Sequence, residues 1–342
     1  MHLLVKPLLY KGEGTSTIRK EGRLMEAEAN RKLARRLAAL ESAGRRPAVL
    51  ADLLKFFGDL VRCLYAVSPP ETSAPIWSDE ELRARAGGGF PLLRPIEDMP
   101  INGLWYRDRA KELLDLLCRR SPDDGELRRV TEAVLTGRLD LDSLGPLAAA
   151  RDREALTSLA QQEGLPVGLV HLLAGACVRP LVEARALQVG PALRLDLWHE
   201  TYCPVCGDGP AVAEIDKEGR RHLLCASCGT SWPSYRVQCA FCGTQDHDQL
   251  HYFTVEDDPG ARVDCCRTCK SYLKSLDRRE GGATEELWVA DLATVHLDLV
   301  GQREGYQHPA PSLVGLVLAA VGVGPVPEPW TPPSLSLPEG EA

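Results

Sequence analysis

Long apolar runs are absent from this chain, and no stretch reaches the roughly 18 residues that a membrane-spanning helix needs. The nearest candidate, Leu313 to Val323, has only 11 residues and includes two glycines. A secretory signal is absent as well, because the apolar run between Met1 and Lys11 is short and lacks a small-residue cleavage site. We therefore expect a cytoplasmic protein with no stable membrane insertion.

An excess of basic residues is also lacking. The 342 residues include 40 Lys and Arg against 48 Asp and Glu, which gives a net charge of −8 at pH 7. Residues 199–280 carry 10 basic and 13 acidic side chains, so they share this balance. A general nucleic-acid binder needs a basic surface that attracts phosphate. We expect no nucleic-acid partner, and the apolar content of 44% suits a soluble globular chain of two or three domains.

Catalytic motifs are missing too. No Ser/His/Asp arrangement and no paired carboxylates stand out in the sequence. Gly87-Gly88-Gly89 lacks the lysine and threonine of a phosphate-binding loop and the spacing of a dinucleotide fingerprint, so we interpret it as an ordinary loop. We predict that the chain is not an enzyme.

Cysteine pairs are the most informative feature that is present. Eight of the twelve cysteines form four Cys-x-x-Cys pairs: Cys203/Cys206, Cys225/Cys228, Cys239/Cys242 and Cys266/Cys269. Two thiolates three positions apart on a tight turn bind one metal ion from the same side, and a second pair completes a tetrahedron. Such a site leaves no position for water or substrate. Two closed sites of this kind are structural or electron-carrying, not hydrolytic.

The spacing of the pairs predicts which of them share an ion. The 18 residues between Cys206 and Cys225 match a two-knuckle metal ribbon, and the 23 between Cys242 and Cys266 are nearly as close. A cross-braced arrangement, first pair with third and second with fourth, is the alternative. Sequential pairing predicts two ligand sets: Cys203, Cys206, Cys225 and Cys228 for the first site, and Cys239, Cys242, Cys266 and Cys269 for the second.

Glycines support the prediction of tight turns. Gly207, Gly229 and Gly243 each follow the second cysteine of a pair, where a positive φ closes the knuckle. Lys270 stands at this position in the fourth knuckle, which we expect to be the least regular.

Other roles for these cysteines fit less well. Four disulfides would need an oxidising compartment, and thioredoxin-like motifs use a single pair beside a βαβ unit. Cys265 could replace Cys266 as a ligand, but it breaks the spacing. A histidine could replace a sulfur, although a strand or supporting role suits the nearby His222, His247 and His251 better. The three remaining cysteines lie in helical apolar patterns and are predicted core thiols: Cys63, Cys118 and Cys177.

The sequence before the cysteines predicts helices over residues 20–190, in a bundle of five to seven. Apolar residues repeat with helical period from Leu50 to Leu64. Ser121 followed by Pro122 resembles an N-cap and first helical position, and Pro166 begins another predicted helix. We expect a break at 137–146, where glycine and proline recur.

Around the cysteines the pattern changes to short strands. Ala211 to Ile215 and His222 to Leu224 predict a hairpin, and Gln249 to Val255 alternates as a strand does. Leu287 to Leu299 returns to helix. Gly324 to Ala342 is rich in proline and is interpreted as a flexible tail.

These motifs resemble the FdhE family of formate dehydrogenase accessory proteins. The resemblance is specific over about residues 199–306. It rests on the following segments: Cys203–Gly207, Cys225–Trp232, Arg236–Gly243, Leu250–Phe253, Cys266–Lys274, Asp291–Leu299 and Gly305–Tyr306.

The resemblance implies an N-terminal α-helical bundle followed by two tandem rubredoxin-like or zinc-ribbon-like four-cysteine modules and a C-terminal helix. We divide the chain accordingly into a helical domain at 1–198, metal ribbons at 199–236 and 237–282, helices at 283–323 and the tail at 324–342. The family leads us to expect iron in both tetrahedral sites, and zinc accepts the same thiolates.

The resemblance also implies a maturation factor that binds the catalytic subunit of a respiratory formate dehydrogenase in the cytoplasm, before export by the twin-arginine route. His251, Tyr272 and Lys274 cluster near the knuckles without an evident core role, so we expect them to be exposed and to form the partner surface. The alternatives are a rubredoxin-like electron-transfer protein and, less favoured by charge, a nucleic-acid-binding zinc ribbon.

Overall fold

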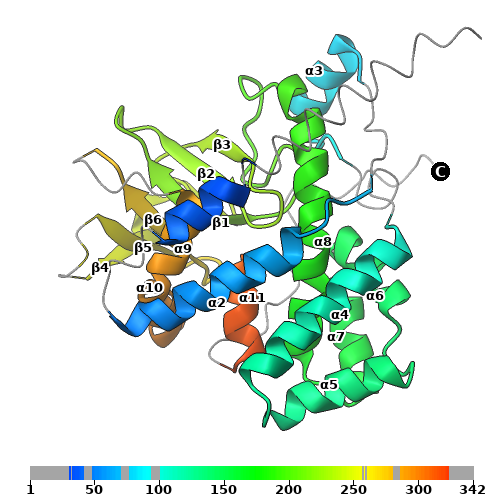
Figure 1. Cartoon of the computed structure of the whole chain (residues 1–342). Coiled ribbons are helices and arrows are strands. Elements are labelled where there is room, and N and C mark those ends of the chain that lie inside the picture. The colour runs from blue at the N-terminus through cyan, green and yellow to red at the C-terminus, as the bar shows by residue number, and fades with distance from the viewer. Residues whose placement is uncertain are drawn as a thin grey trace, which may run out of the picture.

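The computed structural model describes residues 31–41, 48–70, 77–93, 101–255, 258, 260–279 and 286–322, with residue 32 excepted. The proline-rich tail, the apolar run from Met1 and most of the predicted breaks before residue 100 lie outside these residues. The described chain has a helical part, then a β-sheet, then three further helices (Figure 1).

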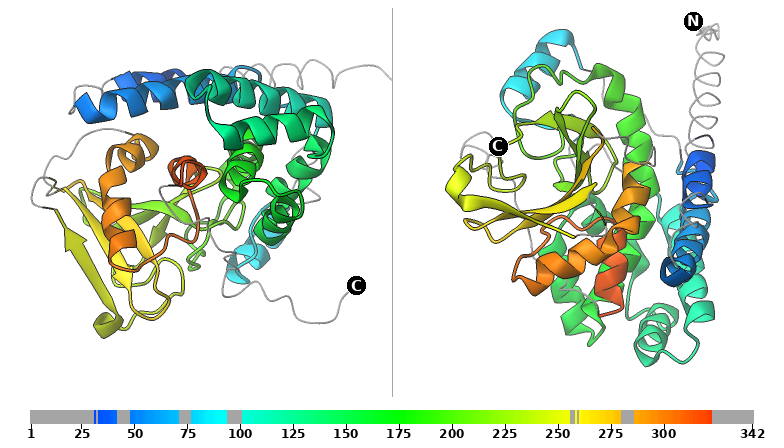
Figure 2. Two further views of the ribbon diagram at one scale, coloured as in Figure 1. Left: turned by 90° about the horizontal axis from the view of Figure 1, so that it is seen from below. Right: turned by 90° about the vertical axis from the view of Figure 1, so that its left-hand side faces the viewer.

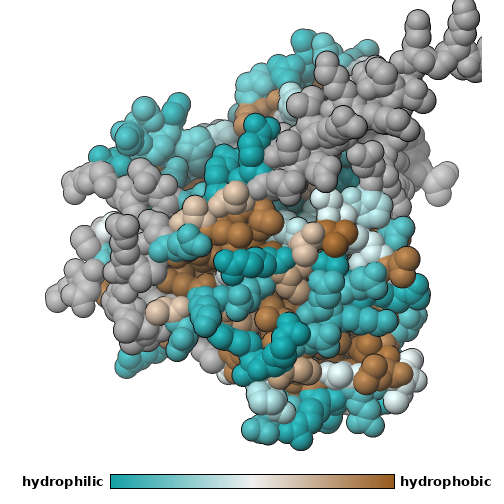
Figure 3. Space-filling view, viewed as in Figure 1, coloured by the Kyte–Doolittle hydropathy of each residue, from teal (hydrophilic) through white to brown (hydrophobic). Residues whose placement is uncertain are grey.

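Helices make up the chain before the cysteines, as the sequence predicts. After a first helix at 33–41 they follow one another as α2 (Ala48–Tyr65), α3 (Asp79–Gly87), α4 (Gly103–Arg120), α5 (Gly125–Leu135), α6 (Leu141–Ala150), α7 (Arg153–Gln162) and α8 (Val167–Val189). The apolar stripe of α2 is confirmed, because Leu54, Phe57, Leu60 and Leu64 are all buried. On the face of the molecule in Figure 3, apolar residues reach the surface in the middle and toward the right-hand edge, among mostly polar residues.

The long helix α8 forms the centre of the helical part. Residues Val167–Ala192 are long and apolar enough to cross a membrane, so the prediction that no stretch reaches this length is wrong. However, 78% of the apolar window is buried inside the protein, so this segment is a core helix. Helix α11 (Leu313–Ala320) packs directly on it. A Cβ at Gly168 would overlap the Ala319 carbonyl oxygen, so this close contact requires glycine.

Two sequence predictions in this part are wrong in detail. The N-cap of α5 is Asp124, whose side chain accepts bonds from two backbone N–H groups, and not Ser121. The expected break at 137–146 ends early, since α6 begins at Leu141 and contains Pro146. The proline costs one backbone bond, but Gly145 beside it lets Tyr106 approach within 3.3 Å of the Cβ position. The packing of Tyr106 against α6 therefore outweighs the local tendency of Gly145 and Pro146 to break a helix.

The six strands of the described residues form one mixed sheet in the order β3-β2-β1-β6-β5-β4. Their bounds are β1 (Pro210–Ile215), β2 (Arg221–Cys225), β3 (Ser231–Ser234), β4 (Leu250–Thr254), β5 (Ala261–Cys266) and β6 (Tyr272–Asp277). The predicted hairpin and the predicted strand near 249–255 are both present. β1 also pairs in parallel with β6, and this pairing joins the two metal ribbons into a single sheet. Local sequence patterns did not predict it.

One face of this sheet is covered by the C-terminal helices α9 (Leu287–Ala293) and α10 (Val295–Arg303). The predicted single helix is broken at Thr294, whose hydroxyl donates to the Ala290 carbonyl. These helices lie between the sheet and the N-terminal helices in both views of Figure 2. The apolar side chains between sheet and helices include Val212, Val263, Tyr272, Leu276 and Leu297.

Candidate metal centres

The first four-cysteine group is fully enclosed. Cys203 and Cys206 precede β1, while Cys225 ends β2 and Cys228 follows it. Sγ–Sγ distances are 3.5 Å between Cys203 and Cys228 and 3.4 Å between Cys206 and Cys225. All four thiols are buried, and their sulfur atoms lie within 4.8 Å of one another. Backbone N–H groups point at the sulfurs, as the Ser227 amide does at 3.4 Å from Cys225 Sγ.

The second group has the same geometry in a more open setting. Sγ–Sγ distances are 3.6 Å between Cys239 and Cys269 and 3.7 Å between Cys242 and Cys266. Cys242 and Cys269 are only partly buried. The structure therefore gathers the cysteines in the sequential pairing, not the cross-braced one. Cys265 lies on the opposite face of β5, in the apolar layer under the C-terminal helices, and is not part of the group.

The knuckles form because their turns reach the left-handed region of φ. Gly207, Gly229 and Gly243 have φ of 77°, 69° and 75°. Lys270 adopts φ of 57°, which is rare for a residue with a Cβ. The fourth knuckle thus keeps the turn at the cost of some strain.

The donor set fits a tetrahedral, thiophilic ion. Burial raises the pKa of the Cys203 and Cys225 thiols well above the ordinary value, while hydrogen bonds from the other cysteines lower the pKa of Cys228, so without a cation the cluster keeps protons on Cys203 and Cys225. A divalent ion replaces those protons and accepts four sulfurs. No histidine belongs to either group, since His222 bonds Asp216 at 3.1 Å and His251 bonds the Tyr306 hydroxyl at 3.1 Å. Both zinc and iron match this donor set.

The helical part holds the first site by hydrogen bonds to backbone carbonyls of the first knuckle. The Leu92 and Leu93 amides donate to the carbonyls of Pro204 and Val205 at 2.9 and 2.8 Å. The Arg151 guanidinium donates to the Cys206 carbonyl. These bonds fix the first knuckle against the loop after α3 and the end of α6.

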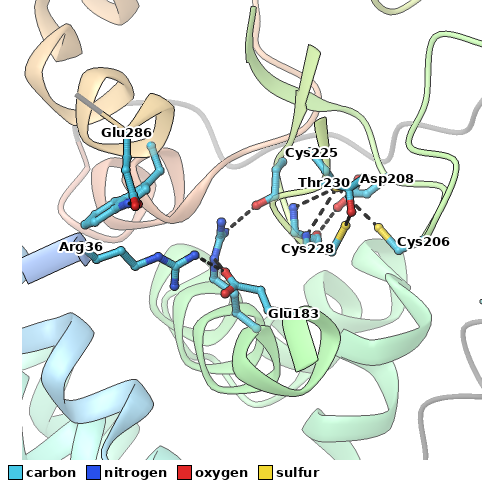
Figure 4. Close-up of polar contacts among 12 residues, drawn as sticks. Arg36, Glu183, Cys206, Asp208, Cys225, Cys228, Thr230 and Glu286 are labelled. Carbon is cyan, nitrogen blue, oxygen red and sulfur yellow. Dashed lines mark hydrogen bonds and ion pairs between the residues drawn. The ribbon is translucent and has the colours of Figure 1, made fainter. Parts of the chain in front are cut away.

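Two more arginines approach the first site from α7 and α8. Arg153 forms an ion pair with Asp208 at 3.2 Å, and Arg179 donates to the Ala226 carbonyl. Arg179 also pairs with Glu183, which in turn pairs with Arg36 at 2.9 Å (Figure 4). A divalent ion with four thiolates carries a charge of −2. Three cations from the helical part therefore face a site that becomes anionic when loaded.

The expectation of an exposed partner surface is wrong for two of its three residues. Tyr272 and Lys274 are 2% and 1% exposed. Lys274 Nζ lies 2.7 Å from Asp291 Oδ1 and 2.6 Å from Asp298 Oδ2, and the Tyr272 hydroxyl donates to Asp298 at 2.9 Å. Lysine is usually exposed, and only the fold brings two carboxylates of α9 and α10 to it. His251 is partly buried against Tyr306.

Sequence reasoning missed the residues around the sites. The arginines of α6 to α8 lie more than 40 positions from the knuckles that they contact, so no spacing rule links them. Asp208 offered a weak signal, because it directly follows the glycine of the first knuckle. Its carboxylate accepts from Gly209 at 2.8 Å and from the Ser227 hydroxyl of the second knuckle, which connects the two turns.

Comparisons with known proteins point to one family. The domain described as FdhE, central domain, matches residues 202–236, and FdhE, C-terminal domain, matches residues 237–314. The first match contains both knuckles of the first site, and the second contains both knuckles of the second site.

Curated relatives match part of the chain. A protein FdhE homolog of Aquifex aeolicus is 40% identical over 114 residues, which are 32% of this chain and 40% of that protein. A homolog of Pseudomonas putida is 34% identical over 169 residues, 45% of this chain and 50% of that protein. Protein FdhE of Escherichia coli K12 is 35% identical over 109 residues, 31% of this chain and 34% of its own. The matched regions thus span half or less of these relatives.

A solved structure extends the likeness to the fold. The crystal structure of the FdhE protein from Pseudomonas aeruginosa superposes with a TM-score of 0.53 at 24% identity, covering 83% of this chain and 95% of that one. This likeness shows a shared fold, including helical part and sheet. Residues 202–314 therefore carry the two domains of the FdhE family, each with one of the four-cysteine groups.

Proposed function

We propose that this chain is an accessory protein in the formation of active respiratory formate dehydrogenase, and that it binds the catalytic subunit in the cytoplasm before export. The observation that carries the proposal is the pair of family domains, each built around a closed four-cysteine site. Closed sites have no position for a substrate, so the metals hold a shape instead of performing hydrolysis. An accessory protein needs a defined shape for its role, and it needs no catalytic turnover.

The test is complementation. A strain that lacks its own accessory gene should regain formate dehydrogenase activity when it expresses this chain together with the matching enzyme. An affinity-tagged chain should also capture the catalytic subunit from the soluble fraction. Restored activity without the chain, or a catalytic subunit that never co-purifies, would contradict the proposal.

Electron transfer is the second candidate, and one observation favours it. Cys242 and Cys269 of the second site are partly exposed, which gives electrons a short path to the surface. If the ion is iron, thiolate-to-iron charge-transfer bands should bleach on reduction and return on oxidation. A colourless protein with bound zinc would exclude this role.

A further inference from the structure

A groove opens beside the second metal site, on the sheet face away from α9 and α10. Its volume is about 530 Å³, within the range of pockets that hold a ligand or several side chains. Strands β4 and β5 form its floor, and the loop before the third knuckle forms one wall. We call it the Arg262 groove, and its distinctive lining residues are Arg221, Arg236, Val237, Tyr252, Arg262 and Asp264.

The groove lies beside β4, an edge strand whose own sequence has none of the usual protective residues. Among the described strands β4 pairs only with β5. Edge strands usually carry proline or charge that prevents pairing with another chain. The sequence of β4 is LHYFT, with neither. The opposite edge, β3, contains Pro233, which lacks a backbone N–H. The β4 edge is therefore the one that can accept a further strand.

Large side chains are exposed around the same groove. Tyr252, Val237 and Tyr235 are 59%, 55% and 53% exposed. Val237 and Tyr252 line the groove, and Tyr235 lies two residues before Val237 in the chain. Single exposed apolar residues are ordinary, but such a group at one groove indicates a contact surface.

Arginines give the groove its chemistry. Arg221 is buried, its Nε has no hydrogen-bond partner, and its Nη2 is 3.6 Å from Asp264. Arg262 pairs with Asp264 at 2.8 Å, and its guanidinium lies 4.9 Å from the centroid of the Tyr252 ring, over strand β4. Arg236 is exposed and has no ion pair among the described residues. The lining thus contains three arginines and one carboxylate, which pairs with two of them.

We propose that the β4 edge and the Arg262 groove bind an extended segment of a partner protein, which adds a strand to β4 and places one or two carboxylates against Arg236 and Arg262. Backbone bonds to an edge supply affinity, while side chains at every second position supply specificity. A continuous polyanion such as nucleic acid fits less well, because Asp246 and Asp248 are exposed nearby and the loaded second site is itself anionic. With the catalytic subunit as partner, the inference rests on the proposed function.

The test compares groove variants with matched controls. Arg236→Glu and Val237→Asp alter exposed groove residues, and Lys217→Glu and Leu135→Asp make the same changes at exposed positions elsewhere. Each groove variant should capture the catalytic subunit about tenfold more weakly, and each control within about twofold of wild type. Metal content and melting temperature should equal those of wild type in all four.

A peptide-binding experiment distinguishes a failure of the groove proposal from a failure of the proposed function. A fluorescein-labelled peptide of alternating glutamate and valine should bind the chain about tenfold more tightly than its lysine counterpart, and Arg236→Glu should remove the preference. Where wild type captures the subunit, unchanged capture by both groove variants overturns the groove and leaves the function standing. Where wild type captures nothing, the function fails and the peptide preference alone decides the groove. Displacement of the peptide by single-stranded DNA at physiological salt would overturn the choice of a protein segment.

Discussion

The two four-cysteine sites share one ligand geometry but differ in their surroundings. The first is enclosed between the helical part and the sheet, and backbone carbonyls of both its knuckles accept bonds from arginines of that part. The second lies beside an open groove, and two of its cysteines are only partly buried. The difference teaches that the same motif can serve two purposes. We interpret the first site as a joint between layers and the second as the support of a contact surface.

The largest expected effect comes from removing a ligand of the joint. Cys225→Ser should lower the metal content by one ion and loosen the helical part, since closed sites contribute on the order of 10 kcal/mol of binding free energy to folding. Limited proteolysis should cut between α8 and β1 much faster than in wild type. Cys269→Ser should lose one ion as well, yet leave the helical part protected. Equal protection in both variants would remove the distinction.

A second prediction concerns the sheet near the other site. Lys274→Met leaves Asp291 and Asp298 buried without their cation, which should cost about 3–5 kcal/mol of unfolding free energy. Urea unfolding measures this loss. Lys217→Met, at an exposed turn, should change stability by less than about 0.5 kcal/mol. A comparable loss in both variants would show that the buried network adds nothing.

The third prediction is a pH dependence in the helical part. Burial, and then Arg153, lower the pKa of His171 to about 4, while the unfolded chain keeps a value near 6.5. The stability from neutral His171 is complete above pH 6.5 and is lost as pH falls toward 4. The loss is at most about 3 kcal/mol. His171→Gln, which can still bond Thr157, should remove this part of the pH profile, whereas a parallel profile would refute the assignment.

The smallest effect sharpens the comparison of the sites. Arg153→Met removes the ion pair with Asp208 and should cost about 1–2 kcal/mol, because Asp208 keeps its bonds to Gly209 and Ser227. Metal release to a chelator should accelerate at the first site only. Faster release at the second site too would mean that the two sites are coupled through the sheet.

The sequence predicted those features that depend on residues close together in the chain. The Cys-x-x-Cys spacing, with a glycine after three of the four pairs, sufficed for both ligand groups, since each knuckle is closed by its own turn. The amphipathic stripe of α2 and the β1–β2 hairpin followed from periodicity. Such patterns could not predict the pairing of strands that are far apart in the sequence. The parallel contact of β1 with β6 joins residues about 60 positions apart, and only that contact makes one sheet from two ribbons.

The sequence also failed to predict which polar residues are buried. Lys274 is charged and lies close to a knuckle, so composition placed it at the surface. Its partners Asp291 and Asp298 come from helices that the fold lays over the strand. Tyr252, by contrast, alternates like a buried strand residue and is exposed, because no described element covers that part of the sheet.

Native mass spectrometry of the purified chain tests the central claim most directly. The account predicts two metal ions per wild-type chain and one in either Cys225→Ser or Cys269→Ser. A wild-type chain without metal, or one whose mass shows the eight thiols joined as four disulfides, would contradict it.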